Sequence, residues 1–294
     1  MIKLYLFGGF RAEDQQATTL PFATNKARAL LAYLAAAPGH PHARRRLADL
    51  LWPTTTEAIA LRNLRTTLAR LRDSLGDPPW LVANRQEVQL TAEPHQLWSD
   101  VNAFDQLWAH LHNGHGVAEQ PLKRGQLRVE ALPAIDGDDW GRNQLTWMAE
   151  AATLYQGEFL AGFFWQEETE GAFWQWRRQK QEEYHGKALT LFHQLADQAL
   201  ADHAYSAAAV YARRQLALEP WRELAHRQLM LALAGAGDYS SALAQYAVCR
   251  QTVADELRMA PEAATTALFQ RLQAERQQLT GWDHGQQNVG RVGP

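Results

Sequence analysis

The most regular pattern of apolar positions in the chain lies between Thr56 and Leu75. Leucines recur there at spacings of three and four residues, which places them along one side of an α-helix. These leucines are Leu61, Leu64, Leu68, Leu71 and Leu75. Glu57 stands in the first turn, where a carboxylate suits the positive end of the helix dipole, and Gly76 follows as a stop signal. The pattern therefore predicts an amphipathic helix over 56–75.

The other sides of this helix carry arginine, asparagine and threonine. The residues are Arg62, Asn63, Arg65, Thr66, Arg70 and Arg72. Arginine can grip guanine or phosphate with a fork of donors, and asparagine can pair with the edge of adenine. An ordinary solvated basic face would have the same composition, and the helix alone favours that interpretation. The elements around it favour DNA.

Shorter patterns before this helix predict two strands and two helices. In chain order they are a strand over 3–10, a short strand that ends near 20–22, and helices over 26–37 and 42–52. Thr24 or Asn25 can cap the first of these helices, and Pro38 ends it. The second helix has an arginine cluster at its start, which includes Arg44 and Arg45.

Behind the leucine helix, residues 80–90 predict a β-hairpin. Its turn lies near 84–86 and has Arg85 at the tip. Strands, three helices and then a hairpin are the order of a winged helix. In that fold the third helix enters the major groove, and the hairpin tip touches the backbone or the minor groove.

Beyond residue 94 the patterns become almost wholly helical. Helices are expected over 100–111, 121–131 and 143–154, with a loop over 132–140, and a long helix from about Glu170 past Leu191. The last third contains a repeat with an offset of 34, in which Ala204-Tyr205 recurs as Asp238-Tyr239. This period is typical of tetratricopeptide helix pairs. Residues 280–294 lack periodicity and predict a disordered tail or a linker.

The sequence thus predicts a mainly α protein with two folded domains. We expect an α/β winged-helix DNA-binding domain over 1–94 and an all-α, tetratricopeptide-like domain over 95–279, followed by the segment 280–294. Charge supports this division. Residues 1–94 hold 12 Lys and Arg against 8 Asp and Glu, and the remainder holds 17 against 24. The excess of basic residues in 1–94 favours a nucleic-acid contact in the first domain.

Composition restricts the class of protein further. A hydrophobic fraction of 46% with 21% charged residues is typical of a globular protein, and no apolar run approaches the length of a membrane span. The single cysteine, Cys249, excludes an intramolecular disulfide framework and fits a cytoplasmic location. We therefore expect no membrane association.

Motifs for catalysis, metals and cofactors are not found. The sequence holds no Gly-x-Ser-x-Gly, no His-Glu-x-x-His and no Cys/His pair placed for nucleophilic work, so an enzyme is not expected. A group of histidines invites interpretation as a metal site, but it lacks cysteine or a paired carboxylate and is interpreted as a solvated turn. These are His95, His110, His112 and His115. We expect no metal and no cofactor.

Five motifs in this order resemble the SARP-type bacterial transcriptional regulators. They are Lys26-x-Arg-Ala-Leu-Leu, Arg46-Leu-Ala-x-Leu-Leu-Trp, Asn63-Leu-Arg-x-x-Leu-x-Arg-Leu-Arg-x-x-Leu-Gly, Leu154-Tyr-x-Gly-x-Phe-Leu-x-Gly, and Ala242-Leu-x-x-Tyr leading to Ala254-x-Glu-Leu. The resemblance covers residues 1–279. It implies an OmpR/PhoB-type winged helix followed by a bacterial transcriptional activator domain (BTAD) of tetratricopeptide (TPR) repeats.

The family resemblance implies an activator that binds double-stranded DNA, often as side-by-side copies or a homodimer on direct repeats, and recruits RNA polymerase. By position, it implies base or phosphate contacts from the third helix and a wing contact from Arg85. The expected DNA-binding residues are Arg62, Asn63, Arg65, Thr66, Arg70, Arg72, Arg85, Arg44 and Arg45. For Arg72, a phosphate contact and a pairing with nearby acidic residues both stay open. Many relatives continue into an ATPase region, but no GxxxxGK[ST] loop occurs here, so the chain either ends at the repeats or is the front of something longer.

Two alternatives stay open at the level of sequence. The repeat domain could make the protein a non-catalytic scaffold whose winged helix only docks partners, or a sensor for a small ligand. Some tryptophans outside the clear apolar stripes fit a groove that holds a peptide. They are Trp140, Trp165, Trp176 and Trp221.

Overall fold

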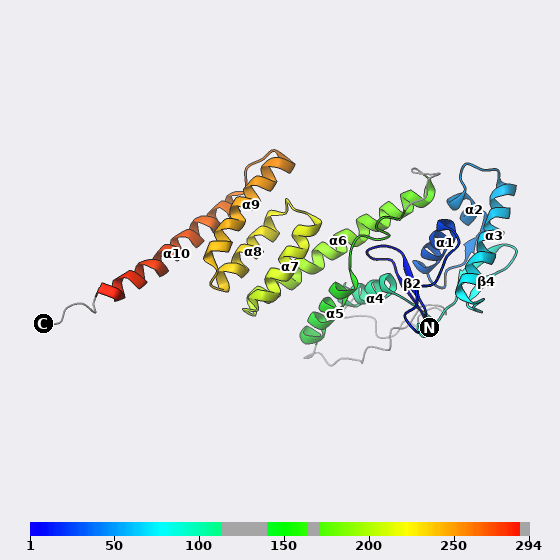
Figure 1. Cartoon of the computed structure of the whole chain (residues 1–294), viewed down its shortest axis with the longest axis horizontal. Helices are drawn as coiled ribbons and strands as arrows, with labels where there is room; N and C mark the ends of the chain where they lie inside the picture. Colours follow the sequence, from blue (N-terminus) through cyan, green and yellow to red (C-terminus); the bar gives the residue numbers. More distant parts are fainter. Residues whose placement is uncertain (113–139, 164–170, 289–294) are drawn as a thin grey trace. The chain divides into compact units, whose positions relative to one another are not determined.

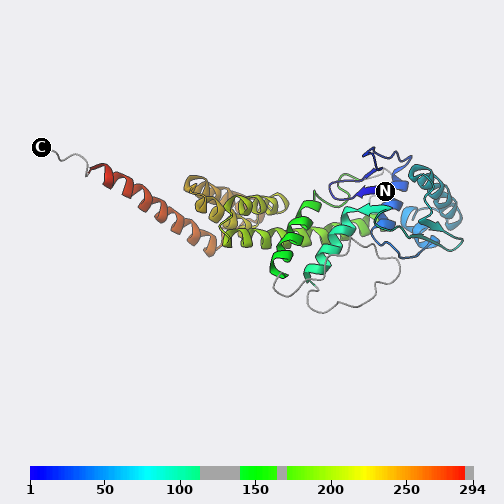
Figure 2. The same cartoon turned by 90° about the horizontal axis from the view of Figure 1, so that it is seen from below.

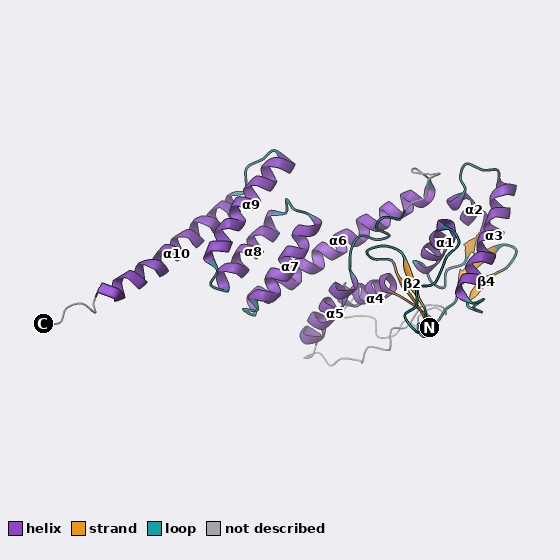
Figure 3. Ribbon diagram, viewed as in Figure 1, coloured by secondary structure: helices purple, strands orange, loops and turns teal. Residues whose placement is uncertain are grey.

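The computed structural model describes residues 1–112, 140–163 and 171–288 (Figure 1). The chain divides into two compact units, Met1–Lys187 (unit 1) and Ala188–Pro294 (unit 2), and each is described by itself. Helices make up most of the described chain, and its strands all lie in unit 1 (Figure 3). The predicted fold class, mainly α with an N-terminal α/β part, is confirmed.

Unit 1 contains the strands and the first helices of the chain. In order they are β1 (Ile2–Tyr5), β2 (Arg11–Glu13), α1 (Asn25–Ala35), β3 (His42–Ala43), α2 (Arg44–Leu51), α3 (Glu57–Leu75), β4 (Leu81–Ala83), β5 (Glu87–Leu90), β6 (Leu97–Ser99), α4 (Asp100–His112) and α5 (Trp140–Leu154). The long helix α6 (Ala172–Ala201) begins in unit 1 and ends in unit 2.

The first sheet has the strand order β2-β1-β6. β1 pairs antiparallel with β2, where Leu4 faces Ala12, and parallel with β6, where Ile2 faces Leu97. The predicted first strand is confirmed but is shorter than expected. The second strand lies at Arg11–Glu13 rather than near 20–22, and β6 was not predicted at all. Both strands depend on pairing with β1, which a local pattern does not reveal.

The three helices of the winged helix form where the apolar periodicity places them. Thr24 caps α1 by accepting a hydrogen bond from the backbone N–H of Ala27. In α3 the leucines at 64, 68, 71 and 75 are buried, and Gly76 ends the helix in the left-handed conformation with φ of 75°. A residue with a Cβ is strained at that φ, which explains the stop.

The wing is a second sheet with the order β3-β5-β4. His42 pairs with Val88 and Ala43 with Glu87, so these two residues are extended. The prediction that the second helix begins at His42 was therefore wrong, and α2 begins at Arg44. Sheet pairing with a strand far along the chain and burial of His42 outweigh the local helical pattern. His42 packs against the ring of Tyr33 in α1 at 5.1 Å between ring centroids.

An aromatic core joins the end of β1 to the helices that follow the wing. The ring centroid of Phe7 lies 5.4 Å from that of Phe104 in α4. It lies 5.0 Å from the ring centroids of both Tyr155 and Tyr184, the latter in α6. The buried carboxylate of Asp100, at the first position of α4, accepts hydrogen bonds from the backbone N–H groups of Leu6 and Phe7. The helices α4 and α5 lie side by side (Figure 2). Within unit 1, the winged helix thus shares its core with the helices that follow it.

The connector after α5 packs directly onto the residues after β1. Leu160 donates a backbone hydrogen bond to the carbonyl oxygen of Leu6 at 2.7 Å, and Gly8 donates one to Glu158 at 3.0 Å. A Cβ at Gly157 would lie 3.1 Å from the Cα of Gly8. Two glycines are therefore needed where the two backbones meet.

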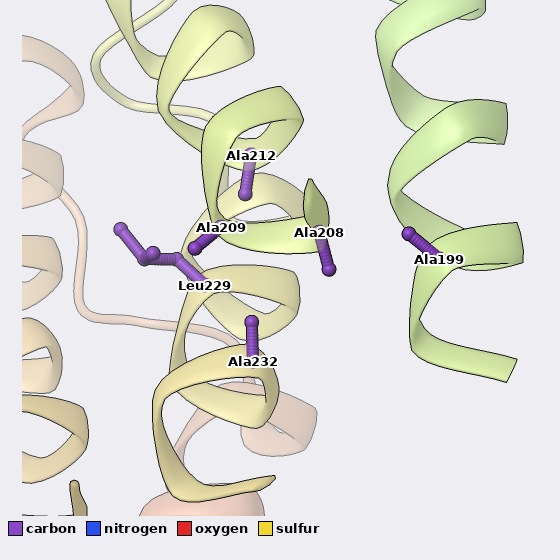
Figure 4. Close-up of a cluster of buried hydrophobic side chains, with 6 residues drawn as sticks. All are labelled: Ala199, Ala208, Ala209, Ala212, Leu229 and Ala232. Atoms are coloured by element: carbon purple, nitrogen blue, oxygen red, sulfur yellow. The ribbon is translucent and has the colours of Figure 1, made fainter. Parts of the chain in front are cut away.

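Unit 2 consists of helices with the predicted repeat. It holds the end of α6, α7 (Tyr205–Leu218), α8 (Glu223–Gly235), α9 (Tyr239–Leu257) and α10 (Ala263–Asn288). Small side chains fill the contacts between successive helices, as Figure 4 shows for Ala208 beside Ala199 and for the residues around Leu229. Small residues let helices approach closely, which agrees with the tetratricopeptide prediction. At Gly235 in α8, an added Cβ would lie 2.2 Å from the ring of Tyr205 in α7.

Other expectations have mixed outcomes. The helix over 100–111, the helix that ends at Leu154 and the long helix from about residue 170 are confirmed. The helix over 121–131 and most of the loop over 132–140 lie outside the described residues. α10 continues to Asn288, into the stretch 280–294 that was expected to lack regular structure. The domain boundaries at 94 and 279 stay predictions. Among the described residues, no helix is long and apolar enough to cross a membrane.

Candidate DNA-binding site

The outward side of α3 presents the predicted contact residues to solvent. Arg62, Arg65, Thr66 and Arg70 are exposed, and Asn63 is half-buried. The side chains of Arg62, Arg65 and Arg70 form no hydrogen bond or ion pair with any residue that the structure describes. The arginines therefore keep all their donors available for a polyanion.

Thr66 has its hydroxyl group partly engaged. Its Oγ1 donates to the carbonyl oxygen of Arg62, one turn earlier, at 3.3 Å. Because the hydroxyl proton is used in this bond, the hydroxyl oxygen can only accept a further hydrogen bond. In this rotamer Thr66 suits a base edge that presents an amino group, such as adenine N6 or cytosine N4.

Three arginines gather where α2, α3 and the wing meet. Burial, followed by the charges of Arg65 and Arg72, lowers the pKa of Arg44 from its usual value. Arg44 Nη1 donates to the carbonyl oxygen of Asn84 at 3.2 Å, and Arg72 Nη2 donates to that of Leu81 at 3.0 Å. Both arginines thus hold the wing beside Arg65, and Arg72 Nε also lies 4.0 Å from Asp77 Oδ1. Positive charges at close range repel one another, and the negative charge of a bound phosphate would offset this repulsion.

Arg45 differs from the other predicted contacts because it already has an acidic partner. Its Nε lies 2.5 Å from Glu57 Oε1, in the first turn of α3, and its side chain is 78% exposed. An exposed pair of this kind is weak, so Arg45 can exchange Glu57 for a phosphate at little cost.

The tip of the wing is a turn that leaves Arg85 exposed. The side-chain oxygen of Asn84 accepts hydrogen bonds from the backbone N–H groups of Gln86 and Glu87, at 2.7 and 2.8 Å. These bonds fix the turn, which holds the Arg85 side chain away from the sheet. Arg85 has no hydrogen-bond or salt-bridge partner within the described parts of the chain.

This surface also contains an apolar residue that the sequence pattern did not indicate. Ile59 lies in the first turn of α3 and is 44% exposed, although it is a large apolar residue. Its position three residues before Arg62 and seven before Thr66 places it on their side of the helix, which the helical spacing alone could have shown.

Clusters for other chemistry do not appear among the described residues. No group of three metal-binding side chains occurs in 1–112, 140–163 or 171–288, and His115 of the predicted solvated turn lies outside these ranges. Cys249 is buried, and burial raises the pKa of its thiol to about 12. Such a thiol is inert as a nucleophile at neutral pH.

The chain is similar to known bacterial proteins. The family model described as "Bacterial transcriptional activator domain" matches residues 130–273. Regulatory protein AfsR of Streptomyces coelicolor is 30% identical over 256 residues, which cover 86% of this chain and 22% of AfsR. The chain has the domain arrangement of the SARP-type transcriptional regulators, a winged helix followed by a bacterial transcriptional activator domain.

A solved structure supports the same fold. EmbR of Mycobacterium tuberculosis, determined in complex with a low-affinity phosphopeptide, aligns over 93% of this chain and 65% of its own with a TM-score of 0.63. Its sequence identity of 19% makes this a likeness of fold. The chain spans about a fifth of the length of AfsR. The chain thus combines a winged helix with an activator domain behind it.

Proposed function

We propose that this SARP-type regulator binds specific double-stranded DNA through α3 and the wing, as a transcriptional activator. The observation that carries the proposal is the row of exposed arginines on α3 that have no partner among the described residues. α3 would enter the major groove, where Arg62, Asn63, Arg65, Thr66 and Arg70 reach bases or phosphates.

The second helix and the wing would hold the protein to the DNA backbone. Arg44, Arg45 and Arg72 lie where phosphates would balance their charge, and Arg85 would reach the backbone or the minor groove from the wing tip. Contacts to phosphate set orientation and carry no sequence information, so discrimination would come from α3.

The activator domain would serve self-association on direct repeats, contact with RNA polymerase, or signal input. Large apolar side chains of unit 2 are exposed and available to a protein partner, among them Trp221 at 38% and Met259 at 65%. Trp176, which was a candidate for a peptide groove, instead packs against Tyr33 at 4.9 Å. The side chains of Trp140 and Trp165 lie outside those described. The protein would act in the cytoplasm, where its DNA is, without catalysis or cofactor.

Selection of duplexes from a random pool, followed by fluorescence anisotropy at two salt concentrations, tests the proposal. We expect a selected duplex to bind much more tightly than a scrambled one, with affinity that falls steeply as salt rises. Arg65→Ala should weaken specific binding. If it contacts a phosphate, the salt slope should drop by about 0.9.

Arg178→Ala is the matched control. Arg178 is 81% exposed, like the arginines of α3, but it lies on α6 and pairs with Glu182. Its replacement should leave DNA affinity unchanged. Equal binding of wild type to selected and scrambled duplexes, or equal loss in both variants, would contradict the proposal. Failure to bind any duplex at low salt would favour the scaffold function.

A further inference from the structure

Ile59 is an exposed apolar residue on the DNA-facing side of α3. Its side chain is 44% exposed, whereas Leu64 and Leu71 on the opposite side are buried. Among the described residues of unit 1, Met1 and Val82 are the other large apolar side chains exposed to this degree. Isoleucine is also a poorer helix former than alanine or leucine. Helix propensity therefore does not explain its presence.

The position of Ile59 relates it to the proposed base contacts. Residues 59, 62, 66 and 70 follow one another at spacings of three and four, so they form one line along the outside of α3. Ile59 is the residue of this line nearest the N-terminal end of the helix. In helix-turn-helix proteins that end of the recognition helix faces the base edges.

The major groove offers one kind of apolar group, the 5-methyl of thymine. A β-branched side chain in a helix keeps essentially one χ1 rotamer, so ordering it against such a methyl costs little entropy. Isoleucine offers no hydrogen bond, and burying it against a base without a methyl would leave base donors or acceptors unpaired. Its chemistry therefore favours thymine over other bases.

We propose that Ile59 is a specificity-determining residue that recognises the 5-methyl group of a thymine in the operator. This inference rests on the proposed function, because it requires α3 to lie in the major groove. It adds an apolar contact to a site that otherwise consists of arginine, asparagine and threonine. The bound sequence should then contain a thymine at a fixed position relative to the guanines or phosphates read by Arg62.

The test replaces each thymine of the selected duplex, one at a time, with deoxyuridine. This change removes the 5-methyl group and keeps base pairing. For the wild type we expect affinity to fall about three- to fivefold at one or two positions, as loss of a buried methyl contact implies. Ile59→Ala should bind the unmodified duplex less tightly and should lose the sensitivity at those positions. Ile59→Val, which keeps a β-branched apolar side chain, should retain part of it.

Val82→Ala is the control, since Val82 is 43% exposed but lies on β4 of the wing. It should keep the wild-type pattern of deoxyuridine sensitivity. Circular dichroism and melting curves of each variant establish that it is folded. Wild-type affinity that is unaffected by deoxyuridine at every position would overturn the proposal while specific binding stands. Equal sensitivity in the wild type and Ile59→Ala would also overturn it. Absence of specific binding by the wild type would instead refute the proposed function, and this inference with it.

Discussion

Both carboxylate oxygens of Asp100 accept the backbone N–H of Leu6, each at 2.9 Å. The same carboxylate accepts the N–H of Phe7 at 3.0 Å and that of Val101 at 2.8 Å. A single side chain thus ties the end of β1 to the start of α4. Because Asp100 is only 3% exposed, water cannot replace these bonds if the carboxylate is lost.

Replacing Asp100 by Asn should destabilise unit 1. The side-chain amide would turn an N–H group towards the N–H groups of Leu6 or Phe7, so we expect a loss of about 1–3 kcal/mol in the free energy of unfolding. Urea denaturation measures it. Asp14→Asn is the control, since Asp14 also accepts backbone N–H groups, from Gln16 and Thr18, but in an exposed turn. A loss in Asp14→Asn as large as in Asp100→Asn would contradict the expectation.

The same variant should alter the dependence of stability on pH. Burial raises the pKa of Asp100 to about 7, against the opposing pull of the N–H groups that it accepts. An acidic group whose pKa is higher in the folded chain than in the unfolded chain adds to the free energy of unfolding. This contribution is complete below the pKa of the unfolded chain, about 4, and is lost as pH rises through 7. The stability gap between wild type and Asp100→Asn should therefore narrow from pH 4 to pH 7. A constant gap would show that the carboxyl group does not titrate in this range.

His42 should make the winged helix sensitive to acid. Burial, followed by the charges of His40 and Arg46, lowers its pKa from 6.5 to about 4. As pH falls from 6.5 towards 4, His42 becomes protonated in the unfolded chain but stays neutral in the folded chain. The free energy of unfolding therefore falls by up to about 3 kcal/mol. His42→Phe keeps a ring against Tyr33 and cannot titrate. Among the described residues, Nε2 of His42 has no hydrogen-bond partner to lose.

We expect the melting temperature of His42→Phe to decline less than that of the wild type between pH 6.5 and 4.5. Differential scanning calorimetry over this range gives the comparison. If the melting temperatures of the two proteins decline equally with falling pH, His42 is not the source of the acid sensitivity.

Gly235→Ala should destabilise unit 2 because α8 lies against the ring of Tyr205. The added Cβ would lie 2.2 Å from that ring, so the ring or the helix must shift, at a cost of about 1–3 kcal/mol. Gly186→Ala is the matched control, because a Cβ at this other helical glycine meets no described residue within 4 Å. It should be neutral or should stabilise by roughly 0.5–1 kcal/mol. Combining Gly235→Ala with Tyr205→Ala should recover part of the loss, and full additivity of the two losses would contradict the proposed clash.

Arg72 should contribute to both stability and DNA affinity. Its Nη2 donates to the carbonyl oxygen of Leu81 in the wing, so Arg72→Ala should lower the free energy of unfolding by about 1 kcal/mol and also weaken DNA binding. Arg70→Ala, an exposed neighbour on α3, should weaken DNA binding with a stability change within about 0.5 kcal/mol. Chemical denaturation and anisotropy titration of both variants separate the two roles. Unchanged stability of Arg72→Ala would show that the bond to Leu81 is dispensable.

The sequence predicts elements that carry their own pattern and misses those that a distant partner holds in place. The leucines of α3 repeat over several turns, and Thr24 and Gly76 mark helix ends, so these features could be read locally. β3 and β6 have two and three residues, too few to show a period. They exist because His42 pairs with Val88 and Leu97 with Ile2, far away in the sequence.

The candidate site shows the same division. The arginines on α3 were predictable because exposure follows from helical spacing. The roles of Arg44 and Arg72 as supports of the wing were not, because they depend on carbonyl groups of Asn84 and Leu81 that only the folded hairpin brings near.

The parallel pairing of β1 with β6 and the packing of Tyr184 on Phe7 have a consequence for how such regulators diversify. A DNA-reading module cut after residue 94 would lose a strand of its sheet and the aromatic core around Phe7. A junction within α6 after Lys187 keeps both, since unit 1 ends there. Under the proposed function, replacing unit 2 at that junction should leave DNA recognition unchanged. The smallest part to transfer as a DNA-binding domain is therefore residues 1–187.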